Sequence, residues 1–378
     1  MKQQIKISLL SVAVALGLAA CGGSSNKTPE KVEPTTFDFA PSAMITNLSN
    51  DVIVAGYTIL NDKAEALHQA AQTLVNTPTQ ANLVAAQEAW IAARAPWEQG
   101  ESHIFGPIDA MGIDPALDSW PLATADLNVV LATPGLINAT AVKAMNTDVQ
   151  GYHTMEYLLF GDGLTDNEKD IAELTDAQST YLLATAEIFK GYTQQLEDAW
   201  LVGIDGVTPY QESFKTANNA IYGSNLAVIE ELITGMVGII NEVGTGKIAD
   251  PFGADIGSID TSKVESQYSW NSLEDFANNI TGVLNVYNGE FTGEADQPGI
   301  YDFVAAGDKV LADRIKAEIV QSIADIKAIP GTTNLPFRQA IADADGRVRI
   351  QTAIDSLAKL EKSLEIDAVA LLKKWSGK

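Results

Sequence analysis

Apolar residues recur at the spacing of an α-helix along almost the whole chain, and the alternation typical of β-strands is nearly absent. This pattern predicts an all-α fold. The predicted helices cover residues 50–75, 78–104, 139–160, 175–202, 209–243, 272–288, 308–328 and 347–375. Thr77 and Pro78 are the expected first residues of the second helix, as N-cap and first helical position, and Gly161 is expected to end the third.

The length of the chain predicts more than one helical bundle. About 335 residues follow residue 43, which exceeds the usual size of a single hydrophobic core. We expect two domains, residues 44–205 and 206–378, each with about four helices. Each half also has an aromatic-rich helix before a glycine-rich loop, clearly at residues 90–106 and more faintly at 276–289. The expected architecture is two packed helical bundles related by duplication of a four-helix bundle.

The first residues look like a lipoprotein signal peptide. Lys2 and Lys6 precede an apolar run, residues 7–18, that is too short to span a membrane. Leu-Ala-Ala-Cys then ends at Cys21, the only cysteine, so cleavage would leave Cys21 as a lipidated first residue and no disulfide could form within the chain. The alternative is a lone structural cysteine behind another kind of signal.

Residues 21–43 are rich in Gly, Ser, Thr, Pro and charge, and we expect them to form a flexible tether. Glycine rather than aspartate follows Cys21, which favours the outer membrane. The expected location is therefore the cell envelope, with the chain anchored by lipid and facing the periplasm.

The chain is strongly acidic, with 24 Lys and Arg against 49 Asp and Glu and a formal net charge of −25. This balance argues against nucleic acid as a partner, since phosphates need basic residues. An acidic field raises the local concentration of cations. The charge is explained equally well if it only keeps an envelope protein soluble. The net charge therefore excludes nucleic acid as a partner, but it does not by itself identify a cation as one.

His153 and Glu156 lie three residues apart, on one face of a predicted helix. The chain has three histidines, and apolar residues flank this pair along its own face. A half-buried carboxylate needs a proton, a cation or a metal as its partner. If His153 binds a metal, its imidazole must be neutral, and affinity should fall below the ordinary histidine pKa of about 6.5. A purely structural pair is the alternative.

The predicted helix 78–104 carries Trp90, Arg94, Trp97 and Glu101 on one stripe. The tryptophans fit a hydrophobic core at least as well as a cofactor site. Arg94 and Glu98 are spaced as a surface ion pair. Glu101 lies near the helix end on the tryptophan face, where an acid either pairs with a buried cation or acts as a ligand.

Four segments of the chain, taken in order, resemble the signature of the imelysin family, helical envelope proteins of bacteria linked to iron uptake. They are residues 89–107, ending in Phe-Gly-Pro; 117–121, Leu-Asp-Ser-Trp-Pro; 151–161, with Gly-x-His-x-x-Glu; and 268–276, beginning Tyr-Ser-Trp-Asn. The resemblance covers about residues 45 to 375. It implies two related bundles with these motifs at their interface, and a metal, iron first and zinc as the alternative.

The resemblance also selects the site residues. The expected metal ligands are His153, Glu156 and Glu101. The expected ligand-binding residues are Trp97, Arg94, Asp118, Tyr268, Ser269 and Asn271. From their local sequence alone, Asp118 would be a turn or cap residue and Ser269 or Ser272 a helix N-cap.

Some members of the family have been described as peptidases. Catalytic zinc usually has two histidines and an acid as ligands and a separate glutamate as base, yet the chain has neither His-Glu-x-x-His nor His-x-x-Glu-His. His103 faces away from Glu101 if the helix continues to it. One histidine with oxygen ligands from Glu101, Asp118 or Glu98 suits iron better than a hydrolytic zinc centre.

We therefore expect a metal-binding protein rather than an enzyme, with a metallopeptidase as the alternative. A third reading is a metal-free module that presents its cleft to another envelope protein. The expected partners are a metal ion or metal chelate, the outer-membrane lipid through Cys21, and envelope transport proteins, with no nucleic acid.

Overall fold

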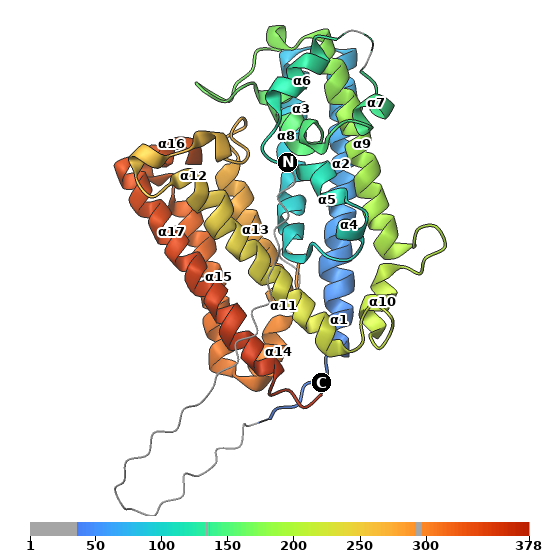
Figure 1. The fold of residues 1–378 in the computed structure, drawn as a ribbon, viewed down its shortest axis with the longest axis vertical. Helices are drawn as coiled ribbons and strands as arrows, with labels where there is room; N and C mark the ends of the chain where they lie inside the picture. The colour runs from blue at the N-terminus through green and yellow to red at the C-terminus, as the bar shows by residue number, and fades with distance from the viewer. Residues whose placement is uncertain (1–35, 134, 136, 292–296, 378) are drawn as a thin grey trace, which may run out of the picture. The chain divides into compact units, whose positions relative to one another are not determined.

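The computed structural model describes residues 36–133, 135, 137–291 and 297–377, so the predicted signal peptide, Cys21 and most of the tether lie outside the described residues. The described part of the chain is helical, with an isolated β-bridge between Phe37 and Trp375 and no strand. The predicted all-α fold is confirmed (Figure 1). None of the described helices is both long and apolar enough to cross a membrane.

The first group of helices is built around α2, α3 and α9 (blue to green in Figure 1). Their bounds are Ala55–Asn76, Gln80–Gly100 and Asp176–Leu201. Helix α2 packs against both α3 and α9, and α8 (Gly151–Phe160) packs between the same two helices. Shorter helices complete this group: α1 Ser42–Asn47, α4 Pro107–Ala110, α5 Ile113–Asp118, α6 Thr124–Leu131, α7 Ala139–Lys143 and α10 Tyr210–Thr216.

The second group is built around α11, α13, α15 and α17 (yellow to red in Figure 1). Their bounds are Asn225–Asn241, Ser272–Asn288, Lys309–Ala328 and Ala344–Lys362. Helix α13 packs against α11 and α15, and α17 packs against α11 and α15. The short helices here are α12 Asp250–Phe252, α14 Ile300–Gly307, α16 Phe337–Ala340 and α18 Val369–Leu372.

The two groups meet where α13 packs against α3 and α11 packs against the 3₁₀ turn Glu101–His103 that follows α3. A Cβ atom built on Gly282 of α13 would lie 2.1 Å from the carbonyl oxygen of Gln99, and one on Gly235 of α11 would lie 2.5 Å from that of Ser102. Only glycine allows so close a backbone approach. The prediction of two packed bundles with the motif residues at their interface is confirmed. The boundary at residues 205 and 206 falls between α9 and α10 and stays a prediction.

The predicted helices that agree best with the structure are those in which the apolar residues keep helical spacing without interruption. The predicted helix 272–288 coincides with α13, and 308–328 differs from α15 by one residue. The predicted helix 139–160 is wrong as one helix, because α7 ends at Lys143 and α8 starts anew at Gly151, whose φ is +69°, after the extended Gln150. The predicted helix 209–243 is interrupted at Ala217 and Asn218, which adopt φ of 35° and 55°.

The N-cap predicted for the second helix is also wrong. Thr79 caps α3 by accepting a hydrogen bond from the backbone N–H of Asn82, two residues beyond the predicted Thr77. The threonine cap itself is the expected chemistry, since its hydroxyl satisfies a free N–H of the first turn.

Candidate metal site

His153 lies in the first turn of α8 and is completely buried. Its Nδ1 is 3.0 Å from Oε2 of Glu156, which is also buried. The other oxygen of Glu156 accepts three hydrogen bonds: from the backbone N–H groups of Tyr268 (3.0 Å) and Ser269 (2.8 Å), and from the Ser269 hydroxyl (2.8 Å). A carboxylate fixed in this way holds the proton of a neutral imidazole on Nδ1 and leaves the lone pair on Nε2.

The Nε2 atom of His153 is buried, and no hydrogen-bond donor among the described residues reaches its lone pair when the ring is neutral. It lies 3.1 Å from Oδ1 of Asp118 and 3.7 Å from Oε1 of Glu265. One ligand atom from each of these three residues lies within 4.8 Å of the other two, an arrangement that could hold a metal ion. The three side chains come from α8, the end of α5 and the segment before α13, so both helical groups contribute.

Gly151 brings α8 close enough to α5 for this convergence. A Cβ at Gly151 would lie 2.1 Å from the carbonyl oxygen of Leu117, the residue before Asp118, and its φ is +69°. Both the contact and the dihedral angle require glycine. The glycine of Gly-x-His-x-x-Glu therefore sets the spacing between His153 and Asp118.

The segment that carries Glu265 and Ser269 has an unusual backbone. Ser266 and Trp270 adopt φ of 48° and 62°, the left-handed region that non-glycine residues rarely enter. The indole of Trp270 donates a hydrogen bond to the carbonyl of Gly163, at 2.9 Å, just after α8. Such strained residues cluster at functional sites and persist only where their surroundings fix them.

Arg94 lies at the centre of the cluster and is completely buried. Its guanidinium donates to Oδ1 of Asp118 at 2.6 Å, to Oδ2 of Asp275 at 3.2 Å and to Glu98, and it lies 3.4 Å from Oε1 of Glu265. The prediction of a surface ion pair between Arg94 and Glu98 is wrong, because α13 covers this face of α3. Burial opposes the charged form, but the neighbouring carboxylates, Asp118 first, raise the pKa of Arg94 well above its ordinary value.

Asp118 is a buried acceptor rather than the turn or cap residue that its local sequence suggests. Its Oδ2 accepts the indole N–H of Trp97 at 2.6 Å, while Oδ1 accepts from Arg94. Burial alone would raise the pKa of Asp118, but the charges of Arg94 and His153 hold it well below its ordinary value. Asp118 is therefore ionised and fixed in position opposite Nε2 of His153.

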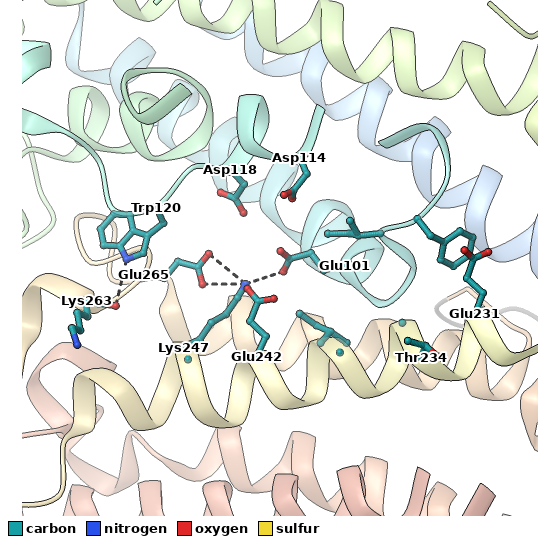
Figure 2. Close-up of a pocket in the computed structure, with 16 residues that line it drawn as sticks. Glu101, Asp114, Asp118, Trp120, Glu231, Thr234, Glu242, Lys247, Lys263 and Glu265 are labelled. Carbon is teal, nitrogen blue, oxygen red and sulfur yellow. Dashed lines mark hydrogen bonds and ion pairs between the residues drawn. The ribbon is translucent and has the colours of Figure 1, made fainter. Parts of the chain in front are cut away.

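Glu101 belongs to a neighbouring arrangement centred on Lys247 (Figure 2). The ammonium of Lys247, from the π-helical segment Glu242–Ala249, lies 2.8 Å from Oε2 of Glu101, 3.3 Å from Oε2 of Glu98 and 3.1 Å from Oε2 of Glu265. The sequence left two roles open for Glu101, a partner of a buried cation or a metal ligand. In the structure Glu101 pairs with the buried ammonium of Lys247. Glu265 belongs to both arrangements: its Oε1 is 3.7 Å from Nε2 of His153 and accepts from Lys247 at 3.4 Å, and its Oε2 is 3.1 Å from Lys247.

Carboxylates outnumber positive charges in this cluster. The buried acids are Glu98, Glu101, Asp118, Glu156, Glu265 and Asp275. Arg94, Lys247 and the imidazole of His153 oppose them. Burial raises the pKa of Asp275 to about 7 in spite of the nearby Arg94, and burial also raises the pKa of Glu101 in spite of Lys247, so both carboxyl groups are costly to ionise here. An added cation would reduce this surplus of negative charge, and the donor set of one imidazole and carboxylate oxygens suits iron and other borderline cations.

The pKa of His153 differs from the value on which the sequence-based expectation rests. Burial opposes a charged imidazole, but Asp118, Glu156 and Glu265 outweigh burial and raise the pKa of His153 well above 6.5. A metal ion must therefore displace a proton from His153 at neutral pH, and not only in acid.

The remaining predicted residues lie around Glu156 and at the start of α13. Tyr268 and Ser269 bind Glu156 as described, and Asn271 donates to Oδ1 of Asp275 at 2.7 Å. The predicted N-cap is wrong: Asn271 is the cap position of α13, and the Ser272 hydroxyl instead donates to the carbonyl of Glu265 at 2.6 Å.

Sequence reasoning missed Glu265, Lys247 and Asp275 as members of the cluster. Glu265 and Lys247 lie in segments without helical periodicity or a recognisable motif, and the periodic pattern gives no sign that α3 covers them. Asp275 lies within the motif segment 268–276, but nothing in that segment distinguishes it from an ordinary acid in the first turn of a helix. One signal in the sequence points to these residues: acids near the motif residues outnumber the basic residues that could pair with them.

Comparison with known proteins gives consistent matches. The family model for imelysin matches residues 53–364. Iron-regulated protein A of Synechococcus elongatus is 30% identical over 337 residues, which are 87% of this chain and 88% of that protein. A crystal structure from Parabacteroides distasonis, named after iron-regulated protein A, is 28% identical with a TM-score of 0.77 and covers 88% of this chain and 94% of its own.

A more distant structure agrees in fold. An imelysin-like protein from Psychrobacter arcticum has a TM-score of 0.70 and covers 90% of this chain and 98% of its own. At 14% identity this similarity concerns the fold alone.

Proposed function

The chain belongs to the imelysin family, and from that premise we propose that it binds a metal ion, iron in the first place, between His153, Asp118 and Glu265. The observation that carries the proposal is the convergence at Nε2 of His153: the atom is buried, no described donor reaches its lone pair in the neutral ring, and oxygens of Asp118 and Glu265 lie 3.1 and 3.7 Å away. A buried lone pair without a partner costs free energy. In the metal-free protein a proton between His153 and Asp118 supplies the partner, and a metal ion would replace that proton.

Glu156 has a different part in this proposal from the one expected from the sequence. It binds Nδ1 of His153 and orients the ring, as carboxylates commonly do for metal-binding histidines. The metal ligands are then one nitrogen and two oxygens from three separate segments. Three protein ligands leave further coordination positions for water, as borderline cations commonly have.

Iron is supported by the name of the relative from Synechococcus elongatus, which refers to regulation by iron. The donor atoms themselves suit several divalent cations, with zinc as the main alternative. The lipobox ending at Cys21 supports a lipid-anchored protein of the outer membrane that faces the periplasm. In that position it would take part in iron uptake, passing the metal to envelope transport proteins.

A metallopeptidase remains the second reading, and the hydrogen bonds of Glu156 count against it. A peptidase of this kind needs a carboxylate that is free to take a proton from metal-bound water. Both oxygens of Glu156 are already engaged, one by His153 and the other by three donors at Tyr268 and Ser269. Glu156 is therefore not that base. Since the chain also has neither His-Glu-x-x-His nor His-x-x-Glu-His, binding is the reading we favour.

The test is metal analysis and thermal unfolding of the purified protein with Fe(II), under anaerobic conditions, or with Zn(II). We expect about one ion per chain and a stabilisation of about 2.7 kcal/mol at a hundredfold excess over the dissociation constant. His153→Ala should lose both effects. His68→Ala, which removes a half-buried histidine of α2, is the matched control and should keep them.

The alternatives predict different results. A structural pair, or a metal-free interaction module, predicts no metal-dependent shift in the wild type and a clearly destabilised His153→Ala. Either that result, or equal metal binding by wild type and His153→Ala, would overturn the proposed site.

A further inference from the structure

A cavity of about 630 Å³ lies directly against the candidate metal site (Figure 2). Asp118 and Glu265, the two carboxylate ligands, form part of its wall. The rest of the wall comes from both helical groups and includes Glu101, Asp114, Trp120, Glu242, Lys247 and Lys263. A metal ion in the cavity would therefore meet both carboxylate ligands of the proposed site.

We propose that this cavity admits the metal as an uncomplexed, hydrated cation and rejects metal held in anionic chelates. This inference rests on the proposed function, because it concerns the form in which that site receives its metal. The charges of the wall, some with partners and some without, distinguish the two forms of the metal.

The positive charges of the wall already have partners. Six carboxylates and two lysines line the cavity. Lys247 is held by Glu98, Glu101 and Glu265, and the ammonium of Lys263 lies 2.8 Å from Oδ1 of Asp250. An anionic chelate, with its carboxylate or phenolate groups, is normally recognised by Arg or Lys side chains that are free to bind it. The described wall offers none.

Two negative charges of the wall, by contrast, have no partner. Asp114 and Glu242 face the cavity and form no hydrogen bond or ion pair with another described residue (Figure 2). Burial, together with Asp118, raises the pKa of Asp114 to about 6. Glu242 is exposed, so water solvates its carboxylate while it adds to the negative charge of the wall. Both carboxylates would be stabilised by a cation in the cavity and further destabilised by an anion.

Size does not decide between the two forms of the metal. Six waters of an octahedral aquo ion occupy roughly 180 Å³ at the volume of liquid water, and so fit easily. The volume would also admit a small chelate. The sign of the charge is what separates them, since clefts lined by one sign of charge concentrate ions of the opposite sign.

The experiment compares Fe(II), added alone under anaerobic conditions, with ferric citrate that carries labelled citrate. The variant is Asp114→Asn with Glu242→Gln. The control is Asp345→Asn with Glu365→Gln, which makes the same charge change at two exposed residues of α17 and the segment after it, away from the cavity. Binding is followed by stopped-flow fluorescence and by counting bound citrate.

We expect wild type and control to bind Fe(II) quickly, with a rate that falls as salt increases, and to retain no citrate. The cavity variant should bind Fe(II) at least about tenfold more slowly, and its association rate should depend less on salt concentration. Retention of citrate with ferric citrate bound as tightly as Fe(II), or a cavity variant as fast as the control, would overturn this inference. If neither form of iron binds to the wild type, it is the proposed function that fails.

Discussion

Glu156 and Ser269, 113 residues apart in the chain, are joined by two hydrogen bonds of 2.8 Å, from the backbone N–H and from the hydroxyl of Ser269. Because the other oxygen of Glu156 holds the ring of His153, the orientation of this histidine in the first helical group depends on a segment of the second.

This relationship predicts a graded series of metal affinities. Glu156→Gln should weaken metal binding about 10- to 100-fold, the usual effect of losing a carboxylate that orients a ligand histidine. Ser269→Ala should weaken it less, because two backbone N–H groups still hold Glu156. Isothermal titration of both variants checks the order. Complete loss of binding in Glu156→Gln would instead make Glu156 a direct ligand.

Glu265 and Glu101 should respond differently to the same substitution. Glu265→Gln removes a proposed ligand and should abolish binding of the metal or weaken it at least 100-fold. Glu101→Gln removes a partner of Lys247 and should change affinity by less than about tenfold, because Glu101 is absent from the group whose donor atoms converge. Equal losses in the two variants would return Glu101 to the ligand set expected from the sequence.

Lys247 is expected to stabilise the metal-free protein. Lys247→Met leaves Glu98, Glu101 and Glu265 without their shared cation, and the loss of one partner from a buried ion pair costs about 3–5 kcal/mol. Denaturant unfolding without metal should show this loss, and added metal should recover part of it. Lys263→Met, on the same cavity but with a half-exposed pair, should change stability by less than about 1 kcal/mol.

Metal affinity should keep rising with pH beyond the ordinary range of histidine. The raised pKa of His153 means that the metal-free imidazole carries a proton at neutral pH, and binding must release it. Affinity then increases by up to about tenfold per pH unit until the pH passes the raised pKa. Titrations between pH 6 and 8.5 in two buffers of different ionisation enthalpy would measure both the slope and the proton released. A plateau above pH 6.5 would contradict the structure.

The lipobox gives a prediction for the part of the chain outside the described residues. Cys21→Ser removes the thiol that would carry the lipid, so the protein should move from the membrane fraction to the soluble periplasmic fraction. Fractionation with immunoblotting checks this. If the variant remains in the membrane fraction and is processed normally, the lipoprotein assignment is wrong.

The fold could be predicted further from the sequence than the site could. Helices such as α13 and α15 follow one apolar period from end to end, and this period is what helical packing requires. The helix predicted over residues 139–160 failed because the break at Gly151 depends on contact with Leu117, which no local pattern reveals.

The site divides in the same way. His153, Asp118 and Arg94 could be found from motifs within single segments. The burial of Glu98 and the part of Glu265 arise only when α13 approaches α3 closely at Gly282, so a pattern read along one helix assigns Glu98 to the surface. The pairing of Glu101 with Lys247 has the same origin, since the two residues are 146 positions apart.

The close approach of the two groups at Gly282 has a mechanical consequence. A cation bound by His153, Asp118 and Glu265 would cross-link the two helical groups at the interface between α3 and α13, since its ligands come from both groups. Thermodynamic linkage makes the effect mutual. The ion favours the closed interface over an open one, and opening the interface lowers the affinity for the ion by the same factor. Separation of the two helical groups would then be enough to release the metal ion, with no chemical change at its ligands.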